Sequence, residues 1–273
     1  MAYDLHCHSV FSDGSTHIKD LLYAAERANL KGIAITDHDT FEGYKVAKAL
    51  KPNLELIQGI EISTIDKSRN KKAHILCYSP KKLELLFDDI NKITENRRNA
   101  MLESIAILNK KYPITLDMVL EKAKHSTCIF KQHIMQCFLE LGITTELFGD
   151  FFKELFNSKN GYAYIDIDYP DTFDIISKVK KTGGKIVLAH PSEYGSMPLL
   201  EELCEKKLID GIEMNHPRNR EEDKKIISEL SKEYNLFLTG GTDFHGYFTS
   251  KPNPIGSFTS SDETVKEFIL KEI

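Results

Sequence analysis

The chain has 273 residues, of which 41% are hydrophobic and 28% are charged, and its formal net charge is −5. This balance is typical of a soluble protein with a sizeable core, and the acidic net charge argues against a partner as long and anionic as duplex nucleic acid. No apolar run approaches the ~20 residues of a membrane span. The first residues, MAYDLHCHS, lack the basic and apolar segments of a secretory signal. We therefore expect a cytoplasmic protein with no membrane partner.

Short apolar runs alternate with amphipathic segments along much of the chain, which indicates an α/β fold. The predicted strands are Tyr3 to His6, Gly32 to Thr36, Glu55 to Ile60, Ala73 to Tyr78, Lys185 to Ala189, Gly211 to Met214 and Leu236 to Thr239. The predicted helices associated with them are Ile18 to Asn29, Phe41 to Leu50, Pro198 to Lys206, Arg220 to Tyr234 and Thr264 to Lys271.

The middle of the chain has helical patterning almost throughout. Its predicted helices are Leu83 to Lys110, Leu116 to Lys124, Lys131 to Leu141 and Thr145 to Phe156. We predict that residues 81–162 form a helical insertion over the mouth of a barrel made by residues 1–80 and 163–273, with Gly161 to Asp171 as the return loop. The basic run Lys67 to Lys72 is expected at a solvated hairpin tip.

Histidine and carboxylate residues gather at the ends of the predicted strands. They are His6, His8, Asp13, His38, Glu61, His74, His190, Glu213, His216, Asp243 and His245. In parallel α/β folds the loops at the carboxyl ends of the strands form the functional site. Residues two apart in a strand point to the same side, so His6 and His8 can bind one ion. Imidazole and carboxylate ligands suit zinc, manganese or iron.

Six segments carry a family resemblance: DLHCHSVFSDGS, GIAITDHDT, GIEIS, HILCY, VLAHP and GTDFHG. In this order they resemble the motifs of the polymerase and histidinol phosphatase (PHP) family of metal-dependent phosphoesterases. The helical insertion is most similar to that of the nucleoside-3',5'-bisphosphate phosphatases and 5'-to-3' exoribonucleases. The resemblance implies a distorted (β/α)7 barrel, two to three divalent metal ions (Mn²⁺, Zn²⁺ or Fe²⁺), and hydrolysis by attack of a metal-bound hydroxide on phosphorus.

The resemblance also implies which residues hold the ions. They fall into three groups: His6, His8, Glu61 and Asp243; Asp13, His38 and His245; and Glu61, His74 and His190. Of these, Glu61, Asp13 and His38 are expected at the catalytic centre. Three dications beside three carboxylates leave a local charge of about +3, which suits a phosphate monoester even in an acidic protein.

Three residues of the insertion resemble substrate contacts of the subfamily. Arg97 and Arg98 resemble the arginines that open the subfamily's long insertion helix, and an arginine pair suits a second phosphate. His133 stands where the subfamily has a phosphate-binding histidine, although Gln132 replaces the usual proline before it. The alternatives are solvated arginines and a structural histidine. The expected substrate is a small phosphorylated molecule: a 3',5'-bisphosphonucleotide, a 5'-nucleotide or the 5' end of short single-stranded RNA.

Three of the ten histidines are neither implied metal ligands nor implied substrate contacts. His17 and His125 are expected at the surface. For His216, a position near the pocket and a structural position both remain open. A histidinol-phosphatase-like activity is the nearest alternative. An amidohydrolase usually needs a lysine at a strand end, and none is found here; a catalytically silent PHP module would not need the complete ligand set. The leaving group, the physiological metal and the oligomeric state are left open.

Overall fold

The protein is described here by a computed structural model covering residues 2–270. It contains one eight-stranded sheet with the strand order β7-β6-β5-β4-β3-β2-β1-β8. The strands are β1 (Ala2–Asp4), β2 (Gly32–Ile35), β3 (Glu55–Asp66), β4 (Lys71–Tyr78), β5 (Lys185–Leu188), β6 (Gly211–Asn215), β7 (Phe237–Gly240) and β8 (Ser260–Ser261). All seven predicted strands are confirmed, and the two-residue β8 is additional.

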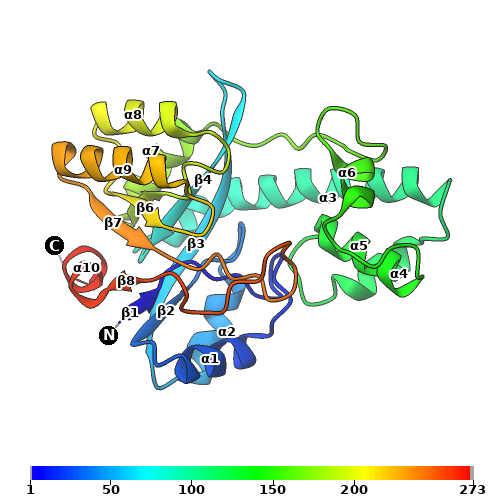
Figure 1. Ribbon diagram of the computed structural model, residues 1–273, viewed down its shortest axis with the longest axis horizontal. Coiled ribbons are helices and arrows are strands. Elements are labelled where there is room, and N and C mark those ends of the chain that lie inside the picture. Colours follow the sequence, from blue (N-terminus) through cyan, green and yellow to red (C-terminus); the bar gives the residue numbers. More distant parts are fainter. Residues whose placement is uncertain (1, 271–273) are drawn as a thin grey trace.

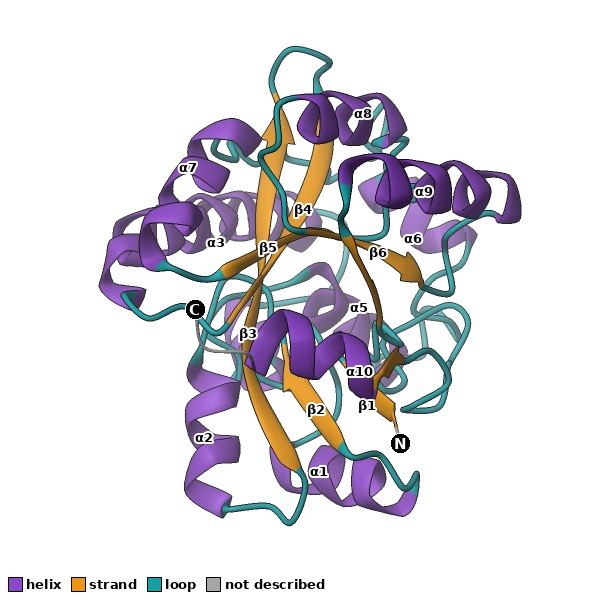
Figure 2. Cartoon of the chain, turned by 90° about the vertical axis from the view of Figure 1, so that its left-hand side faces the viewer, coloured by secondary structure: helices purple, strands orange, loops and turns teal. Residues whose placement is uncertain are grey.

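The sheet curves until its two ends meet. Strands β1, β2 and β3 are mutually parallel, as are β5, β6 and β7, whereas β4 is antiparallel to both of its neighbours. Beyond β1, the Leu5 amide donates to the Gly240 carbonyl (3.3 Å) and the His8 amide donates to the Phe244 carbonyl (2.8 Å). The result is a nearly closed barrel with helices outside it (Figure 2), which confirms the predicted distorted α/β barrel.

Strands β3 and β4 form a long hairpin that extends beyond the predicted strands. Because β4 runs antiparallel, its amino end lies at the same edge as the carboxyl ends of the parallel strands. His74, near the start of β4, therefore faces the same loops as residues that follow other strands. The hairpin turn, residues 67–70, is exposed as expected for the basic run, but Lys72 is partly buried.

Amphipathic helices cover the barrel: α1 (Ile18–Arg27), α2 (Glu42–Leu50), α7 (Thr172–Thr182), α8 (Met197–Glu205) and α9 (Glu221–Tyr234). Helix α7 is absent from the sequence prediction. Asp171 caps it by accepting a hydrogen bond from the Phe173 amide at 2.9 Å. At the carboxyl end of the chain, α10 (Asp262–Val265) continues as the π-helical turn η2 (Lys266–Leu270) and packs Phe268 among inward side chains of the barrel. The predicted end of this helix, Lys271, lies outside the described residues.

The middle of the chain forms a helical region beside the barrel (Figure 1). Its elements are the 3₁₀ helix η1 (Leu83–Leu86), α3 (Phe87–Asn109), α4 (Leu116–Lys122), α5 (Lys131–Glu140) and α6 (Asp150–Phe156). Helices α3 to α6 bury a hydrophobic cluster of their own, which includes Met101 and Phe138. Ser126 donates to the Ser12 carbonyl (2.8 Å), so the region is fixed to the loop that follows β1. Within the described chain, no helix combines the length and apolarity that crossing a bilayer requires.

Candidate active site

His6 and His8 follow β1, and both are fully buried. The Nε2 atom of each imidazole lies 3.1 Å from Glu61 Oε2, so the two rings converge on one carboxylate oxygen. This is the convergence that the alternation of an extended chain predicts. A Cβ atom on Gly241 would lie 2.2 Å from the His6 Cβ, which explains why this close approach needs glycine.

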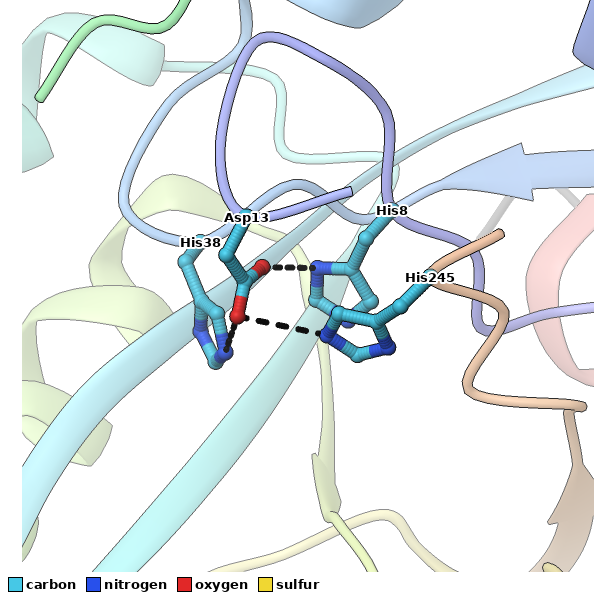
Figure 3. A group of neighbouring side chains, drawn as sticks. All are labelled: His8, Asp13, His38 and His245. Carbon is cyan, nitrogen blue, oxygen red and sulfur yellow. Dashed lines mark ion pairs between the residues drawn. The ribbon is translucent and has the colours of Figure 1, made fainter. Parts of the chain in front are cut away.

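A second group surrounds the carboxylate of Asp13 (Figure 3). Asp13 Oδ1 lies 3.5 Å from His8 Nδ1, and Asp13 Oδ2 lies 3.3 Å from His245 Nε2 and 3.9 Å from His38 Nε2. The loop that carries Asp13 is held by buried Asp37, which accepts hydrogen bonds of 2.7 Å from the Ser9 amide, the Ser9 hydroxyl and the Ser12 hydroxyl. Asp37 therefore fixes the position of the Asp13 carboxylate through the loop that carries it.

Glu61 joins these residues to a third group. Its Oε1 atom lies 2.8 Å from both His74 Nδ1 and His190 Nε2, while its Oε2 atom faces His6, His8 and His38. Both oxygens of this single buried carboxylate are therefore surrounded by imidazoles. The structure thus brings together all of the residues that the resemblance implied as metal ligands.

Two residues of the cluster have backbone conformations that side chains rarely adopt. His190 has a φ of +25° and Asp243 a φ of +52°, both in the left-handed region. Such conformations cost free energy and are retained where the surroundings determine them, often at functional sites. His190 lies two residues after the end of β5, and Asp243 lies three residues after the end of β7.

The donor set fits metal ions. Several cluster nitrogens are buried without a hydrogen-bond partner among the described residues: His6 Nε2, His8 Nδ1 and Nε2, His38 Nδ1, His190 Nδ1 and His216 Nε2. Burial raises the pKa of Glu61, but the surrounding imidazoles outweigh this effect and hold the pKa well below its usual range. Unpartnered imidazole nitrogens around an ionised carboxylate provide the ligands that divalent transition metals prefer. Four groups of three or four such residues have ligand atoms within 4.8 Å of one another.

Glu213 and His216 support the cluster from β6 and the turn after it. Glu213 Oε1 accepts a hydrogen bond from His6 Nδ1 (2.9 Å), and Glu213 Oε2 accepts one from the His190 amide (2.9 Å). His216 Nε2 lies 3.5 Å from Asp243 Oδ2. By occupying His6 Nδ1, Glu213 directs His6 Nε2 toward the centre, as carboxylates behind metal ligands commonly do. The sequence placed both residues at a strand end but assigned neither a role.

Two adjoining cavities open on the cluster. The histidine-lined cavity, of about 250 Å³, is bounded by the cluster together with Glu193, Tyr194, Arg218 and Phe248. The cationic cavity, of about 200 Å³, contains Lys72, Arg97 and Lys131 in its wall. The wall common to both cavities is formed by Asp13, His38, His74, Gln132 and Tyr194. A bound molecule can therefore extend from one cavity into the other.

The cations of the second cavity are incompletely neutralised. Arg97 Nη2 donates to Asp39 Oδ2 (2.6 Å) and to the Ser63 hydroxyl (2.9 Å), but its buried Nη1 has no partner in the described chain. Neither Lys72 nor Lys131 forms an ion pair with a described residue. Burial and the neighbouring Lys72 lower the pKa of Lys131 to about 8. This wall is therefore suited to an anion.

Arg98 and His133 lie elsewhere. Arg98 is exposed on α3 and lines neither cavity. The Nδ1 atom of His133 accepts a hydrogen bond from the Phe130 amide (3.0 Å), and the ring lines a separate hollow with the exposed His17 and His125. Of the three substrate contacts predicted from the sequence, only Arg97 thus reaches the cavities. Lys131, two residues before His133, was not among the predicted substrate contacts, because the family pattern assigns the phosphate contact at this place to the histidine.

Comparisons with known proteins agree with this geometry. Residues 4–239 match the model of the PHP domain family. The phosphoribosyl 1,2-cyclic phosphate 1,2-diphosphodiesterase of Eggerthella lenta is 34% identical over 257 residues, covering 93% of this chain and 97% of that protein. The 5'-3' exoribonuclease of Haemophilus influenzae is 27% identical over 264 residues, covering 89% of each. A crystal structure from Bifidobacterium adolescentis, described as that of a metal-dependent phosphoesterase, is 30% identical in sequence and superposes with a TM-score of 0.89. The superposition covers 99% of this chain and 96% of that one.

The barrel and its cluster of histidines and carboxylates define a metal-dependent hydrolase of phosphoric esters. The chain belongs to the PHP domain family. This confirms the family and the class of reaction that the sequence motifs indicated.

Proposed function

We propose that the protein hydrolyses a phosphate ester of a ribose that carries a second phosphoryl group. The observation that carries this proposal is the pair of adjoining cavities, one lined by histidines and carboxylates and the other by three basic residues. The reacting phosphate would lie in the histidine-lined cavity and the second phosphate in the cationic cavity. Of the substrates expected from the sequence, bisphosphonucleotides and 5'-phosphorylated RNA belong to this class, whereas a 5'-nucleotide with a single phosphate does not.

The ions would be held by the three groups of residues that meet at Glu61 and Asp13. Glu61 contributes to two groups because its two oxygens face different imidazoles. Divalent ions bound there supply an activated water, orient the phosphoryl group and neutralise its charge. The protein fixes this arrangement through Glu213 behind His6 and Asp37 behind the Asp13 loop.

The cationic cavity would bind the second phosphate. Lys72 and Lys131 contribute charge, and Arg97 contributes the unpartnered Nη1, which is held in place by the bonds of Nη2 to Asp39 and Ser63. An arginine whose position is already fixed loses little side-chain entropy when it binds an anion. Binding energy gained in the cationic cavity, away from the reacting atoms, can select the substrate without altering the chemistry.

Two candidate substrates follow from the relatives. The E. lenta relative is named for a phosphoribosyl cyclic phosphate, and the H. influenzae relative is named for RNA. A phosphoribosyl cyclic phosphate also places two phosphoryl groups on one ribose. The greater identity to the E. lenta protein favours this small substrate, and the two modest cavity volumes suit it.

Hydrolysis of a panel of esters tests the proposal, followed as free phosphate for the monoesters and by chromatography of the products for the cyclic phosphate and the RNA. The panel contains 3',5'-bisphosphoadenosine, phosphoribosyl 1,2-cyclic phosphate, a short 5'-phosphorylated RNA, histidinol phosphate and p-nitrophenyl phosphate, each assayed with manganese, zinc and magnesium. We expect kcat/KM to be at least ~10-fold higher for a ribose with two phosphoryl groups than for either single-phosphate ester, the effect of one charge-assisted hydrogen bond. A preference for histidinol phosphate would contradict the proposal.

A further inference from the structure

Arg218 lies at the mouth of the histidine-lined cavity, on the turn that follows β6. Asn219 fixes this turn by donating through Nδ2 to the carbonyls of Glu213 (2.8 Å) and Met214 (3.1 Å). The Arg218 amide donates to His216 Nδ1 at 3.2 Å. The backbone that carries Arg218 is therefore tied to the residues that support the cluster.

Glu193 orients the guanidinium group of Arg218. This glutamate follows β5, the strand next to β6, and pairs with Arg218 Nη1. Its other carboxylate oxygen lies 3.4 Å from His190 Nδ1. Arg218 Nε lies 4.0 Å from Asp243 Oδ2, which places the guanidinium at the border of the cluster. Two loops at the carboxyl edge of the barrel therefore hold one arginine beside the reaction centre.

The charge of Arg218 is unusual for this cavity. The carboxylates in the wall are Asp13, Glu61, Glu193 and Asp243, and Arg218 is the single lysine or arginine among the described residues that line it. Glu193 occupies Nη1, whereas Nη2 has no hydrogen bond to a described residue. The edge formed by Nε and Nη2 therefore remains available for two oxygens of one anion, the bidentate geometry in which arginine binds phosphate.

We propose that Arg218 is a catalytic residue that binds two oxygens of the reacting phosphoryl group through Nε and Nη2, with Glu193 as its positioning residue. The inference rests on the proposed hydrolysis of phosphate esters at this centre. The Arg218 side chain is 47% exposed, so it can contact the substrate from the open side of the cavity. Donors fixed in advance toward the reacting group stabilise charge in the transition state without reorganisation.

Steady-state kinetics of Arg218→Ala test this role with two substrates, p-nitrophenyl phosphate and 3',5'-bisphosphoadenosine. Both contain a reacting phosphoryl group, so we expect kcat to fall by roughly 100-fold for each, the usual effect of removing one such donor. Added guanidinium chloride, below denaturing concentrations, should restore part of the lost activity. Arg218→Lys should remain at least ~10-fold below the unmodified protein because it lacks the planar fork.

Arg220→Ala is the matched control. Arg220 lies on the same turn but pairs with Asp223 at 2.8 Å and does not line the cavity, so its loss should leave kcat and guanidinium dependence unchanged. Bound metal is measured in every variant. Activity of Arg218→Ala near that of the unmodified protein, loss of its metal or fold, or a loss confined to the bisphosphate would each overturn the proposal. If the bisphosphate preference itself fails, reduced and rescuable turnover of p-nitrophenyl phosphate still supports Arg218.

Discussion

The two adjoining cavities differ in how the chain builds them. The histidine-lined cavity is made mainly by residues of the barrel strands and of the loops that follow them, and Gln132 and Phe148 of the helical region complete its wall. The cationic cavity combines Lys72 from the β3–β4 hairpin with Arg97 from α3 and Lys131 from α5. It exists only because the helical region packs against the barrel edge.

The two cavities would therefore have different roles, one in the chemical reaction and the other in substrate selection. Residues of the first cavity would surround the reacting group and would be required for every substrate. Residues of the second would contact a distant part of the substrate and are required only where that part is present. Changes in the two cavities should therefore have distinguishable effects on two substrates, one with a second phosphate and one without.

Removal of metal should have the largest effect. We expect exhaustive chelation to abolish turnover of both 3',5'-bisphosphoadenosine and p-nitrophenyl phosphate, and manganese or zinc to restore it, because the cluster consists of imidazoles and carboxylates. The measurement is phosphate release together with the metal content of the same sample. Undiminished turnover in a sample with no detectable metal would refute the metal centre.

Glu61→Gln should be next in magnitude. Both Glu61 oxygens lie among imidazoles, and a carboxamide supplies neither the charge nor a second acceptor oxygen. We expect kcat to fall by at least ~100-fold for both substrates, in the range seen when a charged active-site group is removed. His17→Ala, at an exposed position, is the control. Equal rates for the two folded variants would contradict the role of Glu61.

Lys131→Ala should separate the two substrates. Loss of a charge-assisted contact costs about 1.5 to 3 kcal/mol, so kcat/KM for the bisphosphate should fall by ~10- to 100-fold. Turnover of p-nitrophenyl phosphate should change little. Lys124→Ala, which removes an exposed lysine paired with Glu121, is the matched control. Equal losses for both substrates would show that Lys131 serves the fold or the reaction centre.

The same lysine predicts a dependence on pH. Burial and Lys72 lower the pKa of Lys131 to about 8, while Asp166 acts in the opposite direction. Lys131 is thus charged below this pH and neutral above it, so KM for the bisphosphate should rise several-fold between about pH 7 and pH 9. Arginine keeps its charge throughout this range, and Lys131→Arg should weaken the dependence. If KM for the bisphosphate depends on pH in the same way in Lys131→Arg as in the unmodified protein, the titrating group is not Lys131.

Arg98→Ala should have the smallest effect. The exposed position of Arg98 on α3 predicts a change of less than about twofold for either substrate, as for most surface substitutions. The kinetic constants of both substrates provide the measurement. A selective loss with the bisphosphate would restore the role that the sequence suggested and would extend the second binding site beyond the cationic cavity.

The barrel strands and the residues that meet at Glu61 and Asp13 could be predicted from the sequence. This was possible because strand periodicity is local: His6 and His8 share one side of an extended segment whatever surrounds them. The ends of parallel strands also meet at one edge, so the positions of these residues predicted a single site, whereas their division into three groups of ligands was implied by the family resemblance. The antiparallel β4 did not disturb this grouping because His74 lies near its beginning.

The partners of these residues could not be predicted, because they depend on how distant elements pack. The contact of Glu213 with His6 and the pairing of Arg218 with Glu193 depend on neighbouring strands and turns coming into register. The cationic cavity depends on the way that α3 and α5 pack against the hairpin. A surface lysine and a partly buried, unpaired lysine have the same sequence pattern, and only packing gives them different electrostatic environments.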